Sequence, residues 1–374
     1  MLALSVLSLA IWLYLIFARG GFWLAAEREK DAPAPAVWPQ VVAVIPARDE
    51  AESIAETVGS LLRQDYPGSF RIVLVDDESA DGTADIARRA AGRGGLDIVT
   101  GTPTPPGWSG KLWAVAQGIA AAGEGPRYLL LTDADISYAP GALAGLVSRS
   151  EAEGLALNSL MARLACESWP ERCAIPAFIL FFQMLYPFAW ANDPRRKTAA
   201  AAGGCMLVRR EALAAAGGIA AIRGALIDDC ALARLLKARA PIRLSLAERV
   251  TSLRRYYDLG EIRRMVVRSA YAQLNYSPAL LVFTLAAMAL VFLVPVAAVF
   301  GHGATQAAGL GAWALMATAF QPTLRDYRVS PLWGFALPAI AALYTLYTLE
   351  SGLASARGQG GLWKGRYQER MARR

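Results

Sequence analysis

Two aspartates follow an apolar run near the middle of the chain. Residues 128–131 are typical of a buried strand, and Asp133 and Asp135 come directly after it. Because side chains alternate along a strand, we expect both carboxylates on the same side, where the strand ends. Open α/β sheets bind ligands beyond the carboxyl ends of their strands. The pair therefore predicts an oxygen site for Mg²⁺ or Mn²⁺, although a solvated turn is an alternative from these residues alone.

Acids also end a second predicted strand and open a later helix. Residues 71–75 are apolar apart from Arg71 and run into Asp76 and Asp77. Asp228 and Asp229 begin a segment whose apolar residues have helical spacing. From the residues alone, this second pair is a helix cap and a partner of the helix dipole.

The scarcity of histidine limits the chemistry. His302 is the only histidine, so a Ser-His-Asp triad, a histidine-bound zinc or a histidine base would have to use it. It lies between apolar segments, where we expect a short connecting loop. The four cysteines contain no C-x-x-C pair, which argues against a zinc site and a disulfide framework. Any catalysis is therefore expected to use carboxylates and a metal ion.

Strands and helices alternate through the first part of the chain. Apolar runs at 41–46, 71–75, 96–99 and 128–131 indicate strands, and helical segments separate them. This order predicts a doubly wound α/β fold with a mainly parallel sheet. The first strand is followed by neither the dinucleotide-binding G-x-G-x-x-G pattern nor a P-loop, so neither fingerprint is present.

Four short motifs stand in order at the ends of the predicted elements. They are Ile45-Pro46-Ala47-Arg48-Asp49-Glu50, Val75-Asp76-Asp77-Glu78-Ser79-Ala80-Asp81-Gly82-Thr83, Lys111, and Asp133-Ala134-Asp135. Each motif is weak alone, but in this order and at these separations they resemble family 2 glycosyltransferases of the GT-A fold. The resemblance implies a doubly wound, mixed, mainly parallel sheet.

The resemblance also implies a site for a nucleotide-diphosphate sugar. Asp77 would recognise the base, and Asp133 and Asp135 would hold the metal ion, Mg²⁺ or Mn²⁺, with the diphosphate. The metal would neutralise the leaving group, and Lys111 could add a point charge. Related sequences often have Asn or Leu-Asn where this chain has Arg48 and Asp49, so base or ribose contacts could differ. The full set implied to bind the nucleotide is Pro46, Ala47, Arg48, Glu50, Asp77, Lys111 and Asp133.

The same resemblance assigns an acceptor side. A small-residue strand that begins with Gly203, Gly204 and Cys205 would face the acceptor, with a packing role for the glycines as the alternative. The second acid of the Asp228-Asp229 pair would be the base of an inverting transfer; the family usually has Glu at the first position. Arg264 and Arg268 are further candidates for contacts to the diphosphate. A Q-x-x-R-W motif typical of processive members is missing, which favours transfer of a single sugar.

Composition and charge indicate a membrane protein. The chain is 55% hydrophobic and 18% charged with a net charge of +7, and it contains no nucleic-acid module. Apolar segments at 279–300, 309–320 and 332–349 are candidate membrane spans. Three spans would place the basic tail outside the cytoplasm, so we expect one of these segments not to span.

Residues 175–190 could lie on the surface and admit a lipid, or form a buried helix. The expected layout is an anchor at 1–24, a linker at 25–40, a GT-A domain at 41–250, amphipathic helices at 251–278, a transmembrane region at 279–354 and a cytoplasmic tail at 355–374.

This layout is similar to that of hopanoid-biosynthesis-associated glycosyltransferases. The resemblance implies a multi-pass enzyme of the bacterial inner membrane with a cytoplasmic catalytic domain and a membrane lipid as acceptor. A polyisoprenyl phosphate, a carotenoid or a sphingolipid are alternative acceptors. A membrane protein that binds nucleotide-sugars without turnover, and a nucleotidyltransferase, are alternatives of another class. The sequence leaves the donor sugar and the oligomeric state open.

Overall fold

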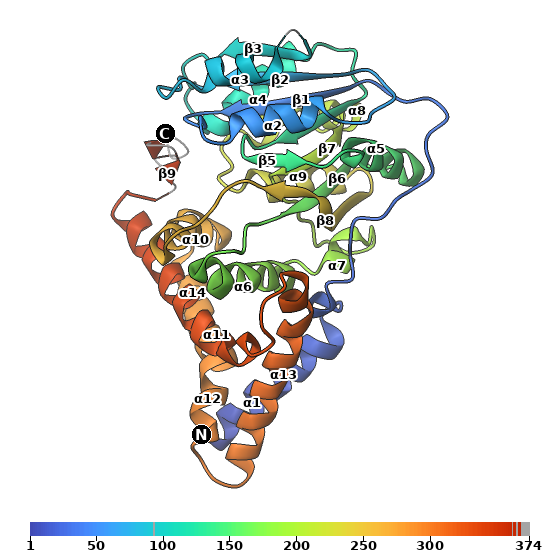
Figure 1. Cartoon of the computed structure of the whole chain (residues 1–374). Coiled ribbons are helices and arrows are strands. Elements are labelled where there is room, and N and C mark those ends of the chain that lie inside the picture. Colours follow the sequence, from blue (N-terminus) through green and yellow to red (C-terminus); the bar gives the residue numbers. More distant parts are fainter. Residues whose placement is uncertain (93, 361, 364–365, 368–374) are drawn as a thin grey trace. The chain divides into compact units, whose positions relative to one another are not determined.

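The computed structural model describes residues 1–92, 94–360, 362–363 and 366–367 (Figure 1). These residues form two compact units. The sheet unit comprises Glu27–Ala165 and Trp190–Arg254, together with residues 366–367. The helical unit comprises Met1–Ala26, Cys166–Ala189 and the described residues of Arg255–Trp363.

A mixed sheet of eight strands forms the centre of the sheet unit (Figure 1). The strands are β1 (Val41–Ala47), β2 (Phe70–Asp76), β3 (Leu96–Thr100), β4 (Tyr128–Thr132), β5 (Ile136–Tyr138), β6 (Leu157–Arg163), β7 (Cys205–Arg209) and β8 (Ile242–Ser252), and their order is β3-β2-β1-β4-β7-β6-β8-β5. β1 to β4 are parallel neighbours, and β6 is parallel to β8. β7 is antiparallel to β4 and β6. The predicted mixed, mainly parallel α/β sheet is therefore confirmed.

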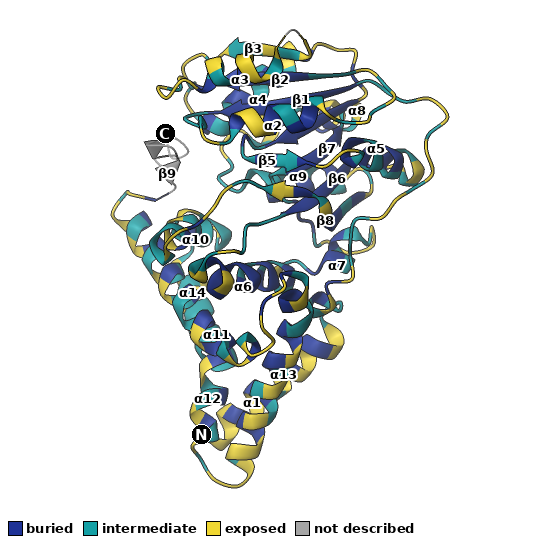
Figure 2. Cartoon of the chain, viewed as in Figure 1, coloured by how far each residue is buried: buried dark blue, intermediate teal, exposed yellow. Residues whose placement is uncertain are grey.

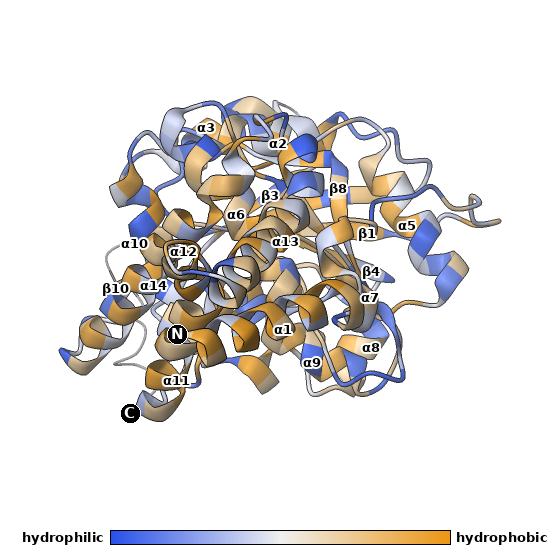
Figure 3. Ribbon diagram, turned by 90° about the horizontal axis from the view of Figure 1, so that it is seen from below, coloured by the Kyte–Doolittle hydropathy of each residue, from blue (hydrophilic) through white to orange (hydrophobic). Residues whose placement is uncertain are grey.

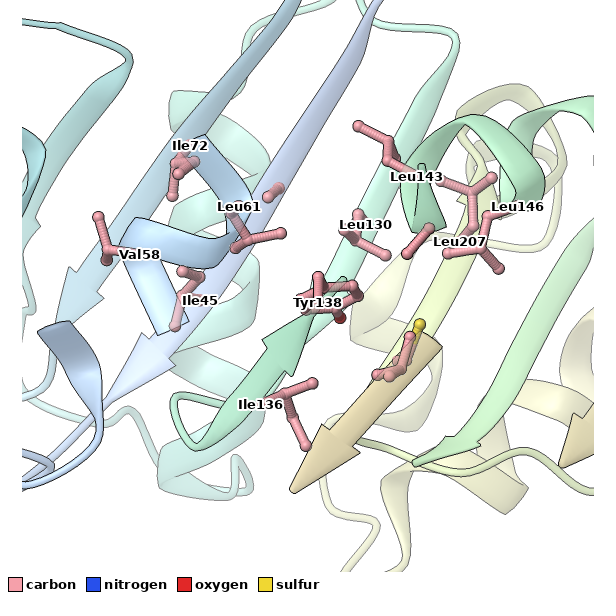
Figure 4. Packing of buried hydrophobic residues seen from close by; sticks show 14 of the residues in the cluster. Ile45, Val58, Leu61, Ile72, Leu130, Ile136, Tyr138, Leu143, Leu146 and Leu207 are labelled. Atoms are coloured by element: carbon pink, nitrogen blue, oxygen red, sulfur yellow. The ribbon is translucent and has the colours of Figure 1, made fainter. Parts of the chain in front are cut away.

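Both faces of the sheet are buried because the central strands are apolar at nearly every position. Ile45 of β1 packs in a core with Val58 and Leu61, whereas Val44 faces a second core that contains Leu112. Figure 4 shows the first core, with Ile45 and Ile72 lying against Val58 and Leu61. Burial of apolar area at about 25 cal/mol per Å² stabilises this arrangement. The helices of the sheet unit are α2 (Ile54–Leu62), α3 (Thr83–Ala91), α4 (Gly110–Ala121), α5 (Ala142–Glu153), α8 (Arg210–Ala215), the 3-10 turn η2 (Ile219–Ile222) and α9 (Asp228–Lys237).

The start of the expected linker at 25–40 is attached to the sheet. The N–H of Glu29 donates to the carbonyl of Leu246 over 2.8 Å, and the N–H of Leu246 donates to the carbonyl of Glu27 over 2.8 Å. The Glu29 carboxylate also accepts from Arg249 Nε at 2.7 Å. This part of the linker therefore adds a short parallel bridge to β8. A single isolated bridge has no sequence pattern of its own, so it could not be predicted.

The helical unit is built mainly from long helices. They are α1 (Leu2–Ala18), the 3-10 turn η1 (Phe22–Leu24), α6 (Trp169–Leu185), α10 (Leu259–Gln273), α11 (Pro278–Met288), the π turn η3 (Ala289–Leu293), α12 (Val294–Val299), α13 (Ala304–Asp326) and α14 (Trp333–Ala356). α7 (Phe188–Asn192) lies where the chain passes into the sheet unit, and the described tail holds the short strands β9 (Leu362–Trp363) and β10 (Arg366–Tyr367). Gly361, Lys364, Gly365 and residues 368–374 of the predicted tail lie outside the described residues.

One continuous helical stretch among the described residues is long and apolar enough to cross a membrane. It is Pro278–Val299, with 22 residues, and α1 is a shorter apolar helix of 17 residues. Figure 3 colours most of α11 and α1 as hydrophobic, and Figure 2 shows exposed residues along α1. Exposed apolar side chains such as Phe17 at 79% and Phe283 at 70% lie on these helices. The other predicted spans lie within α13 and α14, which do not meet the same criterion.

Residues 175–190 do not form the predicted surface segment. Most of them belong to α6, and Ile175, Ile179 and Leu180 are buried. Phe181 packs edge-to-face on Tyr344 at 5.1 Å, and the Tyr344 hydroxyl donates to the Ala174 carbonyl over 3.0 Å. The alternative of a buried helix is therefore correct. The continuous GT-A block expected at 41–250 is interrupted by Cys166–Ala189, which belongs to the helical unit.

Candidate active site

The two acids after β4 lie in a turn whose backbone is held from several sides. The carbonyl of Ala134, between the acids, accepts from Ser53 Oγ at 3.0 Å and from Thr57 Oγ1 at 2.8 Å. The N–H of Leu253 donates to the carbonyl of Asp135 over 2.7 Å. The turn is therefore fixed by α2 and by the residue after β8, so the two carboxylates start from a rigid backbone.

Lys111 links this turn to the start of α9. Its Nζ lies 2.8 Å from Oδ1 of Asp133 and 3.1 Å from Oδ2 of Asp228. Burial opposes the charge on Lys111, but the carboxylates of Asp133 and Asp228 outweigh burial and raise the pKa of the ammonium group. Lys111 comes from the first turn of α4, whose N-terminus is capped by Ser109. Three predicted site residues, far apart in the sequence, therefore meet at one point.

Asp229 lies next to this group and is held by two backbone N–H groups. Its Oδ2 accepts from Gly203 N at 3.0 Å, and its Oδ1 accepts from Cys230 N at 2.6 Å. Burial and the neighbouring carboxylate of Asp228 raise the pKa of Asp229 to about 6, against the opposing effect of Lys111 and the two N–H groups. A carboxylate with this pKa is matched to proton transfer near neutral pH.

Three predicted acceptor-side residues, Gly203, Gly204 and Cys205, lie at or just before the start of β7, and of these only Gly203 has its α-carbon beside the reacting groups. A Cβ built on Gly203 would lie 3.5 Å from Lys111 Nζ and 3.6 Å from Asp229 Oδ2. A Cβ on Gly204 would instead meet Ile136 at 2.9 Å. The Cys205 side chain is fully buried in the core rather than beside the reacting groups, so its acceptor role stays a prediction.

A pocket opens beside these groups. Its volume is about 300 Å³, part of which is open to solvent. The polar lining comes from Lys111, Asp133 and Asp228, and the apolar lining includes Met206 and Ile219. The remaining lining residues are Pro46, Leu112, Val115, Leu131, Thr132, Gly203, Ile222 and Leu232. Apolar walls with a few convergent charged groups are typical of a small-molecule site.

The loops after β1 and β2 are tied to each other. Asp49 N donates to Ser79 Oγ at 3.0 Å, and Ala80 N donates to Asp49 Oδ1 at 2.8 Å. Asp49 and Glu78 both have a positive φ, of 51° and 58°. Non-glycine residues in this conformation are strained and persist only where the surroundings hold them, often at functional sites.

Arg48 and Asp77 meet between these loops. Arg48 NH1 donates to the Asp77 carbonyl over 2.6 Å and lies 3.5 Å from its carboxylate. The Asp77 side chain is only 2% exposed. Arg48 Nε is buried and has no hydrogen-bond partner among the described residues. This residue pair, predicted as part of the nucleotide pocket, is therefore preorganised in the protein alone.

The chemistry around Asp135 fits a divalent cation. Burial and the carboxylates of Asp133 and Glu50 raise the pKa of Asp135 to about 6, and Arg254 and Lys111 oppose this shift. No cluster of three or more His, Cys, Asp or Glu side chains suited to a metal occurs in the described part of the chain. Two carboxylates are enough for Mg²⁺ or Mn²⁺ when substrate phosphates supply further oxygens. The residues present therefore fit a metal held jointly with a diphosphate.

Other predicted site residues lie elsewhere. The Ala47 side chain is buried in the core, so it cannot line a pocket, although its carbonyl accepts from Asp77 N at 2.8 Å. Arg264 and Arg268 belong to α10 in the helical unit, where the Arg264 guanidinium lies 3.9 Å from Glu261. Their role toward a diphosphate stays a prediction.

Sequence reasoning missed three buried hydroxyls around Gly203. Thr132 Oγ1 donates to the Gly204 carbonyl at 2.8 Å and accepts from the Tyr138 hydroxyl at 2.8 Å. Ser159 Oγ accepts from Ala202 N at 2.9 Å. The available signal was a polar residue inside a largely buried strand, as at Ser159 in β6.

One family model matches part of the chain. Residues 42–217 match the sequence model of glycosyl transferase family 2. No curated protein matches the chain.

One of the similar solved structures shares the fold. The mannosyltransferase PcManGT from Pyrobaculum calidifontis, in complex with GDP-Man and Mn²⁺, superposes with a TM-score of 0.58 at 20% identity and covers 93% of this chain and 99% of that chain. S. aureus TarS 1–349 with UDP-GlcNAc gives a TM-score of 0.40 at 15% identity, covering 86% and 92% of the two chains. Glucosyl-3-phosphoglycerate synthase from M. tuberculosis gives 0.39 at 20% identity, covering 63% and 80%. Only the first score is high enough to support a common fold.

Proposed function

Residues 42–217 form a family 2 glycosyltransferase domain, and from this premise we propose that the chain moves one sugar from a nucleotide-diphosphate sugar to a membrane lipid, with inversion. The observation that carries the proposal is the joint position of Asp229, Lys111 and Asp133. A carboxylate with its pKa raised to about 6 lies beside an ammonium group that also contacts the first acid of the Asp133-Ala134-Asp135 turn. The proposed base, Asp229, therefore lies beside Lys111, the cation that would stabilise the leaving diphosphate, and a single displacement requires both groups at one site.

The proposed reaction is one displacement. Asp229 takes the proton from an acceptor hydroxyl while that oxygen forms a bond to the anomeric carbon. The bond between the anomeric carbon and the diphosphate oxygen breaks, and its electron pair leaves with the nucleoside diphosphate. No covalent intermediate on the protein is needed.

Several side chains of this chain have proposed roles on the donor side. Arg48 and Asp77 bind the nucleoside, and Lys111 turns from Asp133 toward the diphosphate. Asp133 and Asp135 would hold Mg²⁺ or Mn²⁺, which supplies Lewis-acid neutralisation of the diphosphate when bound. The raised pKa of Asp135, caused by burial and by the carboxylates of Asp133 and Glu50, supports this proposal because a cation would relieve the same repulsion.

A lipid acceptor is proposed because of the helical unit. The apolar stretch Pro278–Val299 and the exposed apolar side chains of α1 and α11 support attachment to a membrane. We propose the bacterial inner membrane, with the catalytic domain in the cytoplasm and a hopanoid or related polycyclic alcohol as acceptor. The choice of a hopanoid as acceptor rests on the similarity between the predicted layout of this chain and that of hopanoid-biosynthesis-associated glycosyltransferases.

A polyisoprenyl phosphate is the main alternative acceptor. Such an acceptor is already ionised, so it needs no base, and loss of the Asp229 carboxylate would then have a small effect. Carotenoid and sphingolipid hydroxyls would need the base as a hopanoid does. The second alternative, binding of a nucleotide-sugar without turnover, predicts donor binding and no product.

The test is transfer of label into lipid. Membranes that contain the full chain would be incubated with a panel of labelled nucleotide-sugars, Mg²⁺ or Mn²⁺ and a bacterial lipid extract. GDP-mannose is placed first in the panel because PcManGT was solved with GDP-Man and Mn²⁺. Label in the organic phase that is lost with a chelator and with Asp229→Asn supports the proposal. No transfer and no donor hydrolysis by folded protein would contradict it and favour the binding protein.

A further inference from the structure

Residues 202–204, Ala-Gly-Gly, form a turn of small residues between two buried hydroxyls. On one side, Ser159 Oγ accepts from Ala202 N at 2.9 Å and donates to the Ala202 carbonyl at 3.2 Å. On the other side, Thr132 Oγ1 donates to the Gly204 carbonyl at 2.8 Å. Ser159 is fully buried and Thr132 is 2% exposed. The residue between the two anchored positions is Gly203.

Tyr138 fixes the direction of the Thr132 hydroxyl. The Tyr138 hydroxyl donates to Thr132 Oγ1 over 2.8 Å, and the tyrosine side chain is buried in the core of the sheet unit. Because Thr132 Oγ1 accepts this bond, its own hydrogen is free to point at the Gly204 carbonyl. Figure 4 shows Tyr138 within that core, so the donor has little freedom to move.

The anchored turn acts on Asp229. Gly203 N donates to Asp229 Oδ2 at 3.0 Å, and Cys230 N donates to Oδ1 at 2.6 Å. Each carboxylate oxygen thus accepts one backbone bond and keeps lone-pair capacity for a further donor. Of these two hydrogen bonds, only the one from Gly203 comes from outside α9. It therefore sets the orientation of the Asp229 carboxylate relative to the rest of the site.

Gly203 cannot hold the turn with a side chain of its own. A Cβ there would stand 3.5 Å from Lys111 Nζ and 3.6 Å from Asp229 Oδ2, at the wall of the pocket that we propose for the substrate. Because a glycine has no side chain that could anchor its own backbone, hydrogen bonds from neighbouring residues must hold this part of the turn. The two hydroxyls supply that support from β4 and β6.

We propose that Thr132 and Ser159 are positioning residues for the base: they hold the turn so that the Gly203 N–H orients Asp229 toward the acceptor hydroxyl. The inference rests on the proposed function, because it takes Asp229 as the base. It assigns a role in the reaction to two hydroxyls that are already hydrogen-bonded to the backbone of the turn.

The test compares four variants of the full chain in the transfer assay. Thr132→Val and Ser159→Ala remove the hydroxyls, Thr132→Ser restores one, and Ser150→Ala is the matched control. Ser150 is fully buried and donates to the Leu146 carbonyl at 2.8 Å, but it lies on α5. We expect kcat to fall roughly ten- to a hundredfold in Thr132→Val and Ser159→Ala, with donor KM within about twofold of wild type. Thr132→Ser and Ser150→Ala should keep wild-type kcat.

The pH profile gives a second readout. The groups that face Asp229 are Asp228 on the same helix, Lys111 on α4, and the N–H groups of Gly203 and Cys230. The Gly203 N–H favours the ionised carboxylate, so a loosened turn should move the acidic limb of kcat to higher pH in Thr132→Val. Ser150→Ala should leave the limb in place.

Two outcomes separate this inference from the proposed function. If Asp229→Asn is inactive while Thr132→Val and Ser159→Ala behave like Ser150→Ala, the positioning role is wrong and the proposed function stands. If Asp229→Asn stays active, both are overturned. Should Thr132→Val not fold, Tyr138→Phe removes the donor to Thr132 while keeping the ring, and wild-type kcat and pH limb in that variant and in Ser159→Ala would overturn the inference.

Discussion

The ammonium nitrogen of Lys111 lies 3.1 Å from Oδ2 of Asp228, the residue directly before the proposed base. The same nitrogen lies 2.8 Å from Asp133, so one cation joins the donor side to the acceptor side. Asp228 also raises the pKa of Asp229, as the second cause after burial. The charge on Asp228 should therefore control the pH at which the base works.

We predict an acidic limb in the rate profile near pH 6. Asp229 must be ionised to accept a proton, and its pKa is raised to about 6 by burial and by Asp228. The rate should be full above this pH and fall about tenfold per unit below it. The measurement is kcat against pH with saturating donor and acceptor.

Asp228→Asn provides the control for that limb. The change removes a like charge beside Asp229, so the limb should move to lower pH. Lys111 keeps its contact with Asp133 in this variant, which preserves a cation in the site. A limb that does not move would show that the titrating group is not Asp229.

Asp229→Asn should lose activity without losing stability. General base catalysis contributes roughly 10²- to 10⁴-fold, so kcat should fall by about that factor. The folded pKa of about 6 is above the ordinary value of 3.8, so the stability linked to this group is full below about pH 4 and is lost as pH rises through 6. At neutral pH the amide removes a cost of the order of 1 to 3 kcal/mol, but its NH₂ group faces one of the two backbone N–H donors, which costs a similar amount, so Tm should change little.

The stability outcome has its own check. Thermal unfolding of wild type and Asp229→Asn should be compared at about pH 4 and pH 8, because the stability of the variant relative to wild type should be greater at the higher pH. A variant that unfolds at both values would mean that the carboxylate is structural. The activity loss would then say nothing of a base.

The fold could be predicted because its signal is local. β4 is apolar at each of its first four positions and ends beside Asp133, so both the strand and its acids stand out in the sequence. Motif order then placed Lys111, Asp133 and Asp229 in one site, and the contacts of Lys111 and Gly203 bring them together. The contacts that bring these residues together give a weaker signal in the sequence.

The rest depends on contacts between distant segments. Ser159 and Ala202 are far apart in the chain, and nothing in either local sequence indicates their hydrogen bonds. The same holds for Cys205, which follows two glycines in the sequence but turns its side chain into the core. The position of α6 could not be predicted for another reason. An apolar segment of its length is equally compatible with a surface segment and with a buried helix, and the packing of Phe181 on Tyr344 shows that it is buried.

The two glycines before β7 should respond differently to alanine. Gly203→Ala places a methyl group at ordinary contact distance, 3.5 Å from Lys111 Nζ, so the protein should fold, but the methyl group enters the site. We expect kcat/KM for the acceptor to fall at least about tenfold with Tm unchanged within about 2 °C. Kinetics and thermal unfolding of the purified variant measure both.

Gly204→Ala is the matched comparison. Its Cβ would meet the end of the Ile136 side chain at 2.9 Å, so the cost should appear in stability as overpacking of about 1 kcal/mol. Its activity per folded molecule should exceed that of Gly203→Ala. The reverse order would contradict the placement of Gly203 in the site.

Arg48→Met should weaken donor binding more than it slows the chemical step. Arg48 NH1 holds the Asp77 carbonyl at 2.6 Å, and its buried Nε has no hydrogen-bond partner among the described residues. Loss of these donors should raise the Kd of the nucleoside diphosphate about tenfold, or ~1.4 kcal/mol. Calorimetric titration measures the Kd, and kcat should stay within about threefold.

Arg71→Met is the control for Arg48. Arg71 lies on the neighbouring strand β2 and pairs with Asp97 at 2.6 Å, away from the two loops. Its loss removes a partly exposed ion pair and should leave nucleotide binding unchanged. Equal effects of the two variants would show that charge in general, rather than the Arg48 contacts, sets the affinity.

The membrane proposal can be tested on two exposed residues of α11. Val282 is 67% exposed and Phe283 is 70% exposed, within the one stretch apolar enough to span. An aspartate at the centre of a span costs about 2.5 to 3.5 kcal/mol and less toward its end, so two of them, Val282→Asp with Phe283→Asp, should lower retention in the membrane pellet after alkaline carbonate washing. Val37→Asp, at an 80% exposed position of the sheet unit, is the control. If the double variant stays folded and its fractionation matches that of Val37→Asp, α11 does not lie in lipid, because a charge at a water-exposed position has almost no cost.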